Sequence, residues 1–236
     1  MSNDNKESIP AFYLDDKSTI AAKFGGKSLG EIFSQIHQSN YWDNKGTVSG
    51  PGSDVDQTKT IRIALPALFD RLSIRSMLDA PCGDLAWIHD ILPDNLAYYG
   101  VDIVPEIITS NKEHFSDRSF TFSLADLTED PLPTADLILC RDCLVHFSEA
   151  NIRKALKNFH SSGASWLLMT SFTGNRSYQE FPDGGWRAIN FQLPPFSIPE
   201  PDFILDENCT ELDLAYTDKA LCLWSMDKIG SALKGK

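Results

Sequence analysis

Short apolar runs alternate with amphipathic stretches over most of this 236-residue chain. The apolar runs have the length of strands and are bounded by turn residues. They predict strands at residues 76–79, 98–103, 120–126, 135–140, 166–172, 203–205 and 220–226. Apolar residues at helical spacing predict helices at residues 29–42, from 58 onward, after Gly83, at 105–115 and at 149–159. This alternation predicts an α/β fold, a doubly wound Rossmann-like sheet that is mostly parallel with an antiparallel C-terminal strand.

Several residues are expected to mark the ends of these helices. Thr58 is placed to cap the helix that carries Ile61 and Leu65, and Pro66 either bends this helix or marks its first turn. Ser148 is expected to cap the helix at 149–159, which Gly163 ends.

The chain divides into two predicted parts. Residues 1–57 form an N-terminal arm, a helix and a Ser/Gly loop that together act as a lid, and the polar residues 1–25 are expected to be a flexible arm or an irregular lid. Residues 58–236 form the α/β domain, from which residues 173–202, rich in Gly, Pro and aromatics, make an excursion over the sheet's carboxyl edge. The loop Thr47–Ser53 either connects two helices or brings N–H groups and hydroxyls to a ligand carboxylate.

Composition and charge exclude several classes of function. Hydrophobic residues make up 42% of the chain, enough for a substantial core. The formal net charge of −12 disfavours nucleic-acid binding, so we expect a small, neutral or carrier-presented substrate. No apolar run approaches transmembrane length. The charge pattern does not indicate an oligomeric state.

Five cysteines make an odd count, which together with the lack of a signal peptide favours a cytoplasmic protein. Cys140 and Cys143 form a CxxC, but no second Cys/His pair lies nearby. Zinc binding, redox chemistry and plain buried thiols all remain open, and buried thiols are the preferred interpretation.

Acidic residues end several of the predicted strands. Open α/β sheets bind ligands outside the carboxyl ends of their strands, where Asp79, Asp102 and Asp126 fall. Asp102 takes the place of an acid that contacts ribose hydroxyls. The GxGxxG fingerprint is absent, since only Gly83 remains of its glycines, and this counts against a pyrophosphate-binding NAD or FAD site.

Four ordered motifs carry a family resemblance: residues 77–84 (MLDAPCGD), 99–103 (YGVDI), 125–127 (ADL) and 136–147 (DLILCRDCLVHF). In this order the chain resembles the class I S-adenosylmethionine-dependent methyltransferases. The resemblance implies that Asp79 orients the methionyl part of the cofactor, Asp102 accepts from ribose and Asp126 from adenine. The cofactor-binding residues that it implies are Ser49, Asp79, Ala80, Cys82, Gly83, Asp102, Ile103, Asp126, Leu127 and Arg141.

A narrower resemblance is to bacterial methyltransferases found with sugar and capsular-polysaccharide biosynthesis. It depends on Trp42 and on residues 49–53, 185–190 and 194–196. It implies O-methylation of a small-molecule, nucleotide-sugar or glycan acceptor, while N-methylation stays open. The acceptor-binding residues implied are Trp42, Trp186, Arg187 and Asn190, with packing of the lid or core as the alternative for both tryptophans.

His146 is the candidate general base and Asp142 its catalytic neighbour, because both follow the fourth predicted strand, near the expected position of the methyl group. The alternatives are a packed histidine and an ion pair between Arg141 and Asp142. Asp142 and His146 would need a third ligand to hold magnesium, so no metal site is predicted.

Two other functions remain open. An NAD(P)-dependent oxidoreductase has the same alternation of strands and helices but needs the missing glycines. A non-catalytic methyltransferase-like binding domain would keep the cofactor motifs without turnover.

Overall fold

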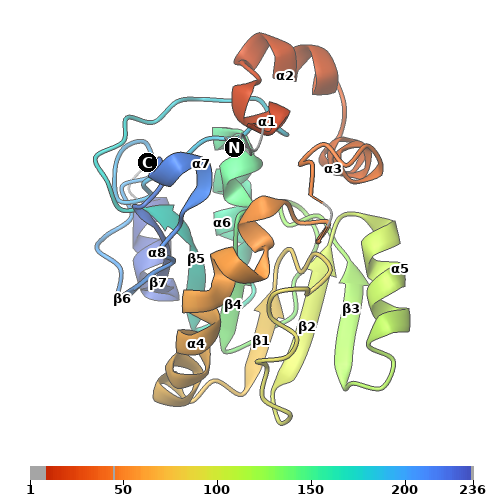
Figure 1. Cartoon of the computed structure of the whole chain (residues 1–236). Helices are drawn as coiled ribbons and strands as arrows, with labels where there is room; N and C mark the ends of the chain where they lie inside the picture. The colour runs from red at the N-terminus through yellow and green to blue at the C-terminus, as the bar shows by residue number, and fades with distance from the viewer. Residues whose placement is uncertain (1–8, 45, 235–236) are drawn as a thin grey trace, which may run out of the picture.

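The computed structural model describes residues 9–44 and 46–234, and within them the centre of the molecule is a seven-stranded sheet (Figure 1). The strand order is β3-β2-β1-β4-β5-β7-β6, and all neighbouring strands are parallel except those that pair with β7. The order reverses between β1 and β4, which opens a crevice at their carboxyl ends. The predicted fold class is therefore confirmed. The strands are β1 Ser76–Asp79, β2 Ala97–Asp102, β3 Phe120–Leu124, β4 Leu137–Cys140, β5 Trp166–Phe172, β6 Phe203–Asp206 and β7 Lys219–Ser225.

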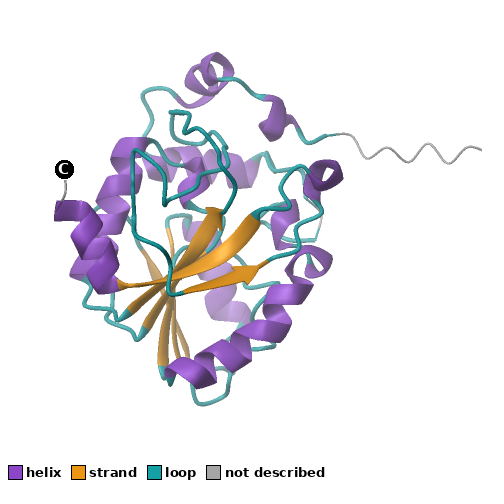
Figure 2. Cartoon of the chain, turned by 90° about the vertical axis from the view of Figure 1, so that its left-hand side faces the viewer, coloured by secondary structure: helices purple, strands orange, loops and turns teal. Residues whose placement is uncertain are grey.

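Helices occupy both faces of the sheet and the space beyond its carboxyl edge (Figures 1 and 2). They are α1 Ala11–Leu14, α2 Lys17–Phe24, α3 Leu29–Gln38, α4 Val55–Leu72, α5 Pro105–His114, α6 Glu149–Ser161, α7 Glu211–Leu214 and α8 Met226–Lys234, with short 3₁₀ turns η1 Pro51–Ser53 and η2 Leu144–His146.

Alternation along the central strands divides the core into two layers. Leu137 and Leu139 of β4 pack in one cluster with α4, α5 and the segment after β1, whereas Ile138 and Cys140 pack in the other with α6 and α8. All four side chains are buried, as a central parallel strand with both faces covered requires.

A small helical unit made of α2 and α3 lies beyond the carboxyl ends of the parallel strands (Figure 1). Ile20 and Phe24 of α2 pack with Ile32 and Ile36 of α3. The expectation of a flexible or irregular segment over residues 1–25 is wrong for α2, because Asp16 caps the helix and the Ile20–Phe24 pair gives it an apolar face. Residues 1–8 lie outside the described part of the chain.

Helix α4 begins earlier than the sequence predicts. It starts at Val55, so Thr58 is not its cap; Thr58 is buried and its hydroxyl donates to the carbonyl of Asp54. Pro66 lies inside the helix, and the predicted division between residues 57 and 58 falls within it. The first predicted helix is shorter than expected and stops at Gln38, before Trp42.

The helix predicted after Gly83 is absent, since residues 83–96 form a series of turns. Leu85 has a φ of 57°, which interrupts a right-handed helix. Trp87 and Ile88 are both buried in the core layer beneath α4, so this short crossover packs its apolar side chains without helical geometry.

Asp136 joins the amino-terminal ends of the two central strands. Its Oδ2 accepts hydrogen bonds of 2.8 Å from the backbone N–H groups of Arg75 and Ser76, and the Ser76 hydroxyl accepts from the backbone N–H of Asp136 at 2.9 Å. Although burial opposes it, these donors hold the pKa of Asp136 below its usual value. The side chain thus fixes the register of β1 against β4.

We predict that Asp136→Ala lowers the free energy of unfolding by about 1–2 kcal/mol, because two strand-end N–H groups lose their acceptor. Urea denaturation measures this change. Asp136→Asn keeps one acceptor oxygen and should lose less. An unchanged midpoint in Asp136→Ala would show that water replaces the carboxylate at no cost.

Candidate active site

A pocket of about 900 Å³ lies where the strand order reverses, at the carboxyl ends of β1, β2 and β4. Nine of the ten predicted cofactor-binding residues line this pocket, which is called the cofactor pocket below. Ala80 is the exception: its side chain is buried in the core, and its N–H donates to the carbonyl of Leu139 at 2.9 Å.

Asp102 is held rigidly at the end of β2. Its Oδ2 accepts from the N–H of Gly83 at 3.1 Å and its Oδ1 from the N–H of Val104 at 3.0 Å. Burial raises the pKa of Asp102 to about 6 despite these donors. Each oxygen keeps a lone pair for a further donor, such as a hydroxyl of a ligand.

Asp79 ends β1 beside the same pocket and is also buried. Its Oδ2 accepts from the Tyr98 hydroxyl at 2.9 Å. Burial raises the pKa of Asp79 to about 7, and the charge of Asp102 contributes. Two desolvated carboxylates facing one pocket favour a ligand that brings a cation or hydroxyl donors.

Gly83 and the Ser/Gly loop are in close contact. Gly83 has a φ of 52°, and a Cβ built on it would lie 2.2 Å from Ser49 Oγ. The same loop is tied to the turn by Asp84, which accepts from the Thr47 hydroxyl at 2.8 Å and from the N–H of Val48 at 2.9 Å. The loop therefore contributes to the pocket wall, which favours the ligand-contact interpretation over a plain connector.

Helix α3 supplies a wall of the cofactor pocket that the sequence did not reveal. Phe33 and His37 line the pocket from this helix, and Trp42 lines it from the turns that follow. Within residues 9–44 and 46–234, three buried side-chain atoms have no hydrogen-bond partner: His37 Nδ1 and Trp42 Nε1 at this pocket, and Arg187 Nε away from it. The two at the pocket are available to a bound ligand. The sequence does contain a signal for this wall, because Phe33 and His37 are four residues apart and therefore lie on the same face of the helix.

Asp126 lies beyond the end of β3 and lines the cofactor pocket. Its Oδ1 accepts from the N–H and the hydroxyl of Thr128, at 2.8 and 2.7 Å, so it also closes a polar turn. Its second oxygen is not used in that turn, which leaves an acceptor at the pocket.

A second pocket of about 390 Å³ adjoins the first and is called the acceptor pocket below. The two pockets share Trp42, Ser49, Asp142 and His146. The other lining residues are Phe12, Tyr13, Gly50, Pro51, Gly52, Phe172, Trp186, Glu211, Tyr216 and Lys219. A group passing from one pocket to the other would pass the four shared residues.

His146 lies in η2, directly after the loop that follows β4. Its Nδ1 is 3.2 Å from the carbonyl oxygen of Gly185, so Nδ1 carries the hydrogen and Nε2 keeps a lone pair. Burial lowers the pKa of His146 to about 4, so the ring is neutral near pH 7. Its centroid is 5.0 Å from that of Trp42.

Buried ion pairs lie beside His146. Arg141 pairs with Glu207 at 2.6 Å and with Asp142 at 3.3 Å, and Lys219 pairs with Asp142 at 2.7 Å. Although burial opposes it, Lys219 and Arg141 lower the pKa of Asp142 to about 2. The Arg141–Asp142 pair expected as an alternative is present. Glu207 and Lys219 were missed because they lie far away in sequence: Glu207 directly follows β6, and Lys219 begins β7.

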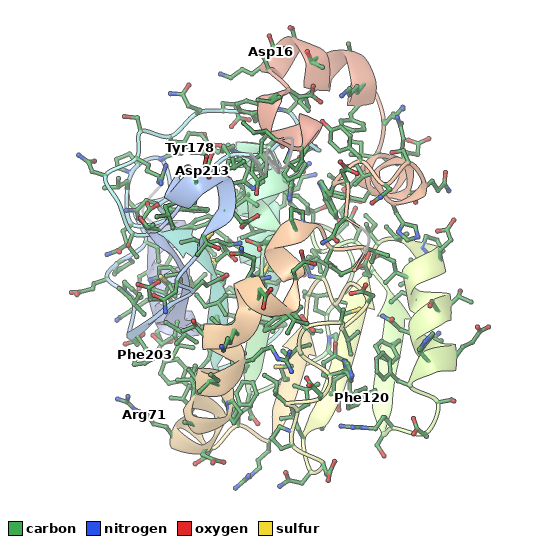
Figure 3. All side chains as sticks on the ribbon, viewed as in Figure 1. Asp16, Arg71, Phe120, Tyr178, Phe203 and Asp213 are labelled. Atoms are coloured by element: carbon green, nitrogen blue, oxygen red, sulfur yellow. The ribbon has the colours of Figure 1, made fainter. Side chains whose placement is uncertain are left out.

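Two predicted acceptor-binding residues, Arg187 and Asn190, do not line either pocket. Arg187 donates to the carbonyl of Val145 at 3.1 Å and to the hydroxyl of Tyr178 (labelled in Figure 3) at 3.0 Å. Asn190 donates to the carbonyl of Gly174 at 2.9 Å. Both side chains hold the 173–202 excursion together, because its irregular backbone needs side-chain partners.

No group of three metal-ligating side chains occurs among the described residues. Cys140 and Cys143 are buried free thiols. In the part of the chain that the structure covers, no helix combines the length and the apolar character needed to cross a bilayer.

Residues 78–163 match a family model described as a methyltransferase domain. Among solved structures, the fold is similar to PigF with SAH, with a TM-score of 0.61 and 13% identity over 91% of this chain and 67% of that chain. It is also similar to human N-acetylserotonin methyltransferase in complex with SAM, with a TM-score of 0.55 and 17% identity over 87% of this chain and 57% of that chain. At these identities the two structures show the fold alone. No curated protein matches the sequence.

We predict that affinity for S-adenosylmethionine rises with pH between about 5 and 8, because ligand donors need Asp102 and Asp79 ionised and their pKa values are about 6 and about 7. As the pH decreases below the pKa of Asp102, protonation of Asp102 by itself should lower the affinity about tenfold per pH unit. Calorimetric titration at several pH values measures this. Asp102→Asn is the control and should bind more weakly with a flatter pH dependence. A constant affinity across the range would contradict the assignment.

Proposed function

We propose that this chain, an S-adenosylmethionine-dependent methyltransferase, methylates a hydroxyl of a sugar or another small metabolite with His146 as general base. When bound, the cofactor supplies a methyl group on a positively charged sulfur. The observation that carries the proposal is the position of His146 and Asp142, which line both the cofactor pocket and the acceptor pocket.

The residues of the cofactor pocket match the parts of this cofactor. Asp102 is the acceptor for the ribose hydroxyls, Asp79 faces the methionyl ammonium, and Asp126 with Leu127 takes the adenine edge. The partnerless buried atoms of His37 and Trp42 support the fit, because a bound ligand would satisfy them.

His146 has the geometry of a general base. Since its Nδ1–H is directed at the carbonyl of Gly185, Nε2 is the atom that can take the proton of the acceptor hydroxyl. In the proposed reaction the acceptor hydroxyl would give its proton to Nε2 of His146, which would pass it to solvent, while the bound cofactor would supply the methyl group to the hydroxyl oxygen. The charge of Asp142 raises the pKa of His146 against the effect of burial, and so stabilises the imidazolium that forms.

The flanking segments serve as covers in this proposal. The described part of the predicted lid at residues 1–57 acts as a cover, since Phe12, Phe33 and Trp42 line the two pockets. The 173–202 excursion contributes Trp186 to the acceptor pocket and the Gly185 carbonyl that orients His146.

The alternatives have less support. A nicotinamide-dependent oxidoreductase would need close backbone approach to a pyrophosphate, and the turn after β1 offers a single glycine. A non-catalytic binding domain gives no reason for a neutral histidine between the two pockets.

We predict that His146→Ala lowers kcat at least 100-fold while leaving the dissociation constant for S-adenosylmethionine essentially unchanged, because the side chain acts on the acceptor proton. Methyl transfer from labelled cofactor and calorimetric titration give the two quantities. His114→Ala, at an exposed histidine on α5, is the matched control and should retain wild-type kcat. Equal losses of turnover and cofactor affinity would make His146 structural.

A further inference from the structure

We infer that the acceptor is a neutral aromatic compound carrying the hydroxyl to be methylated, and not a nucleotide sugar or another anion. This inference rests on the proposed function and specifies its substrate class. It follows from three properties of the acceptor pocket: its aromatic walls, its small number of free polar groups, and its excess of negative charge.

Aromatic rings make up much of the acceptor pocket. Tyr13, Phe172, Trp186 and Tyr216 pack against one another there, with the Trp186 centroid 4.8 Å from both tyrosines and 6.2 Å from Phe172. Trp42 lines the same pocket beside His146. Ring faces and edges of this kind favour a planar ring in the pocket over a flexible or strongly hydrated group.

Most of the charged and strongly polar side chains in the acceptor pocket already have partners. Glu211 accepts from the Tyr13 hydroxyl at 2.7 Å and from Lys219 at 3.4 Å, and Lys219 also donates to Asp142 at 2.7 Å. In the described part of the chain, the side-chain groups of this pocket left for an acceptor are His146 Nε2, the hydroxyls of Ser49 and Tyr216, and the indole N–H groups of Trp42 and Trp186.

These five groups, two of them on indole rings, suit one or two hydroxyls on an apolar ring. A hexose carries several hydroxyls around its whole edge, and each one that leaves water without a new partner weakens binding. Sugar recognition would therefore need polar side chains that this pocket does not offer among the described residues.

The charges beside the acceptor pocket sum to an excess of one negative charge. Arg141 and Lys219 face the carboxylates of Asp142, Glu207 and Glu211 in one network of ion pairs. Both cations are fully engaged in this network, so a phosphate or carboxylate would meet no free positive partner. Asp79 and Asp102 add further negative charge in the adjoining pocket, so an anionic acceptor would be repelled from this site.

The test uses the full chain and a set of matched acceptors. Catechol is the neutral aromatic probe, 3,4-dihydroxybenzoate adds a carboxylate, cyclohexane-1,2-diol removes the aromatic ring, and methyl glucoside and UDP-glucose represent sugars. Binding to the complex with S-adenosylhomocysteine is measured by calorimetry, and methyl transfer is measured with labelled cofactor. We expect catechol to bind and be methylated, with at least a tenfold lower kcat/KM for every other probe.

A pair of variants assigns the effect to the pocket. Trp186→Leu should raise KM for catechol at least tenfold without changing affinity for S-adenosylhomocysteine, because Trp186 lines the acceptor pocket and not the cofactor pocket. Trp166→Leu is the matched control. Trp166 begins β5, at the end of the strand away from the pocket residue Phe172, so its replacement should leave KM for catechol unchanged.

The outcomes separate the inference from the function on which it rests. Methylation of methyl glucoside or UDP-glucose with a higher kcat/KM than catechol overturns the inference and leaves the methyltransferase assignment intact. Failure of catechol to bind, or an unchanged KM in Trp186→Leu, also overturns it. Binding of catechol without methylation supports the aromatic pocket and counts against His146 as the base for O-methylation.

Discussion

The hydrogen bond from the Gly83 N–H to Asp102 joins the turn after β1 to the end of β2, and the geometry of the site depends on it. It requires a backbone N–H directed at the neighbouring strand and a φ of 52° that favours glycine. The same turn leaves room for Ser49, which could not approach a side chain at this position. One backbone contact therefore brings together the acid, the turn and the Ser/Gly loop, three parts of the chain separated in sequence.

Burial explains the electrostatics of both pockets. It raises the pKa of Asp79 and Asp102 and lowers that of His146, so the surrounding protein disfavours charge on all three groups. Asp142 is different, since Lys219 and Arg141 keep it ionised against the same burial. A cation bound near the two strand-end acids, Asp79 and Asp102, would stabilise their ionised forms. The ammonium group of S-adenosylmethionine is such a cation.

Sequence reasoning succeeded where function follows from strand ends. The acids at Asp79 and Asp102 are readable because parallel strands bring their carboxyl ends to one edge, whatever the intervening chain does. It failed where contacts join distant segments: Glu207 and Lys219 belong to the ion-pair network only because β7 pairs with β5, and β6 with β7. Arg187 and Asn190 were expected at an acceptor, but in the structure both donate to backbone carbonyls, because an irregular loop needs side-chain partners. The helix expected after Gly83 failed because burial of Trp87 and Ile88 outweighed local helical preference.

The two pockets draw on different kinds of sequence. Most of the cofactor pocket comes from one continuous stretch, from Asp79 to Phe147, whereas the aromatic walls of the acceptor pocket come from α1, Trp42, the end of β5, the 173–202 excursion and the residues around Tyr216. A change in the length or sequence of those peripheral segments would therefore alter the second pocket more than the first. The architecture thus lets the shape of one pocket vary while the sheet and the other pocket stay the same.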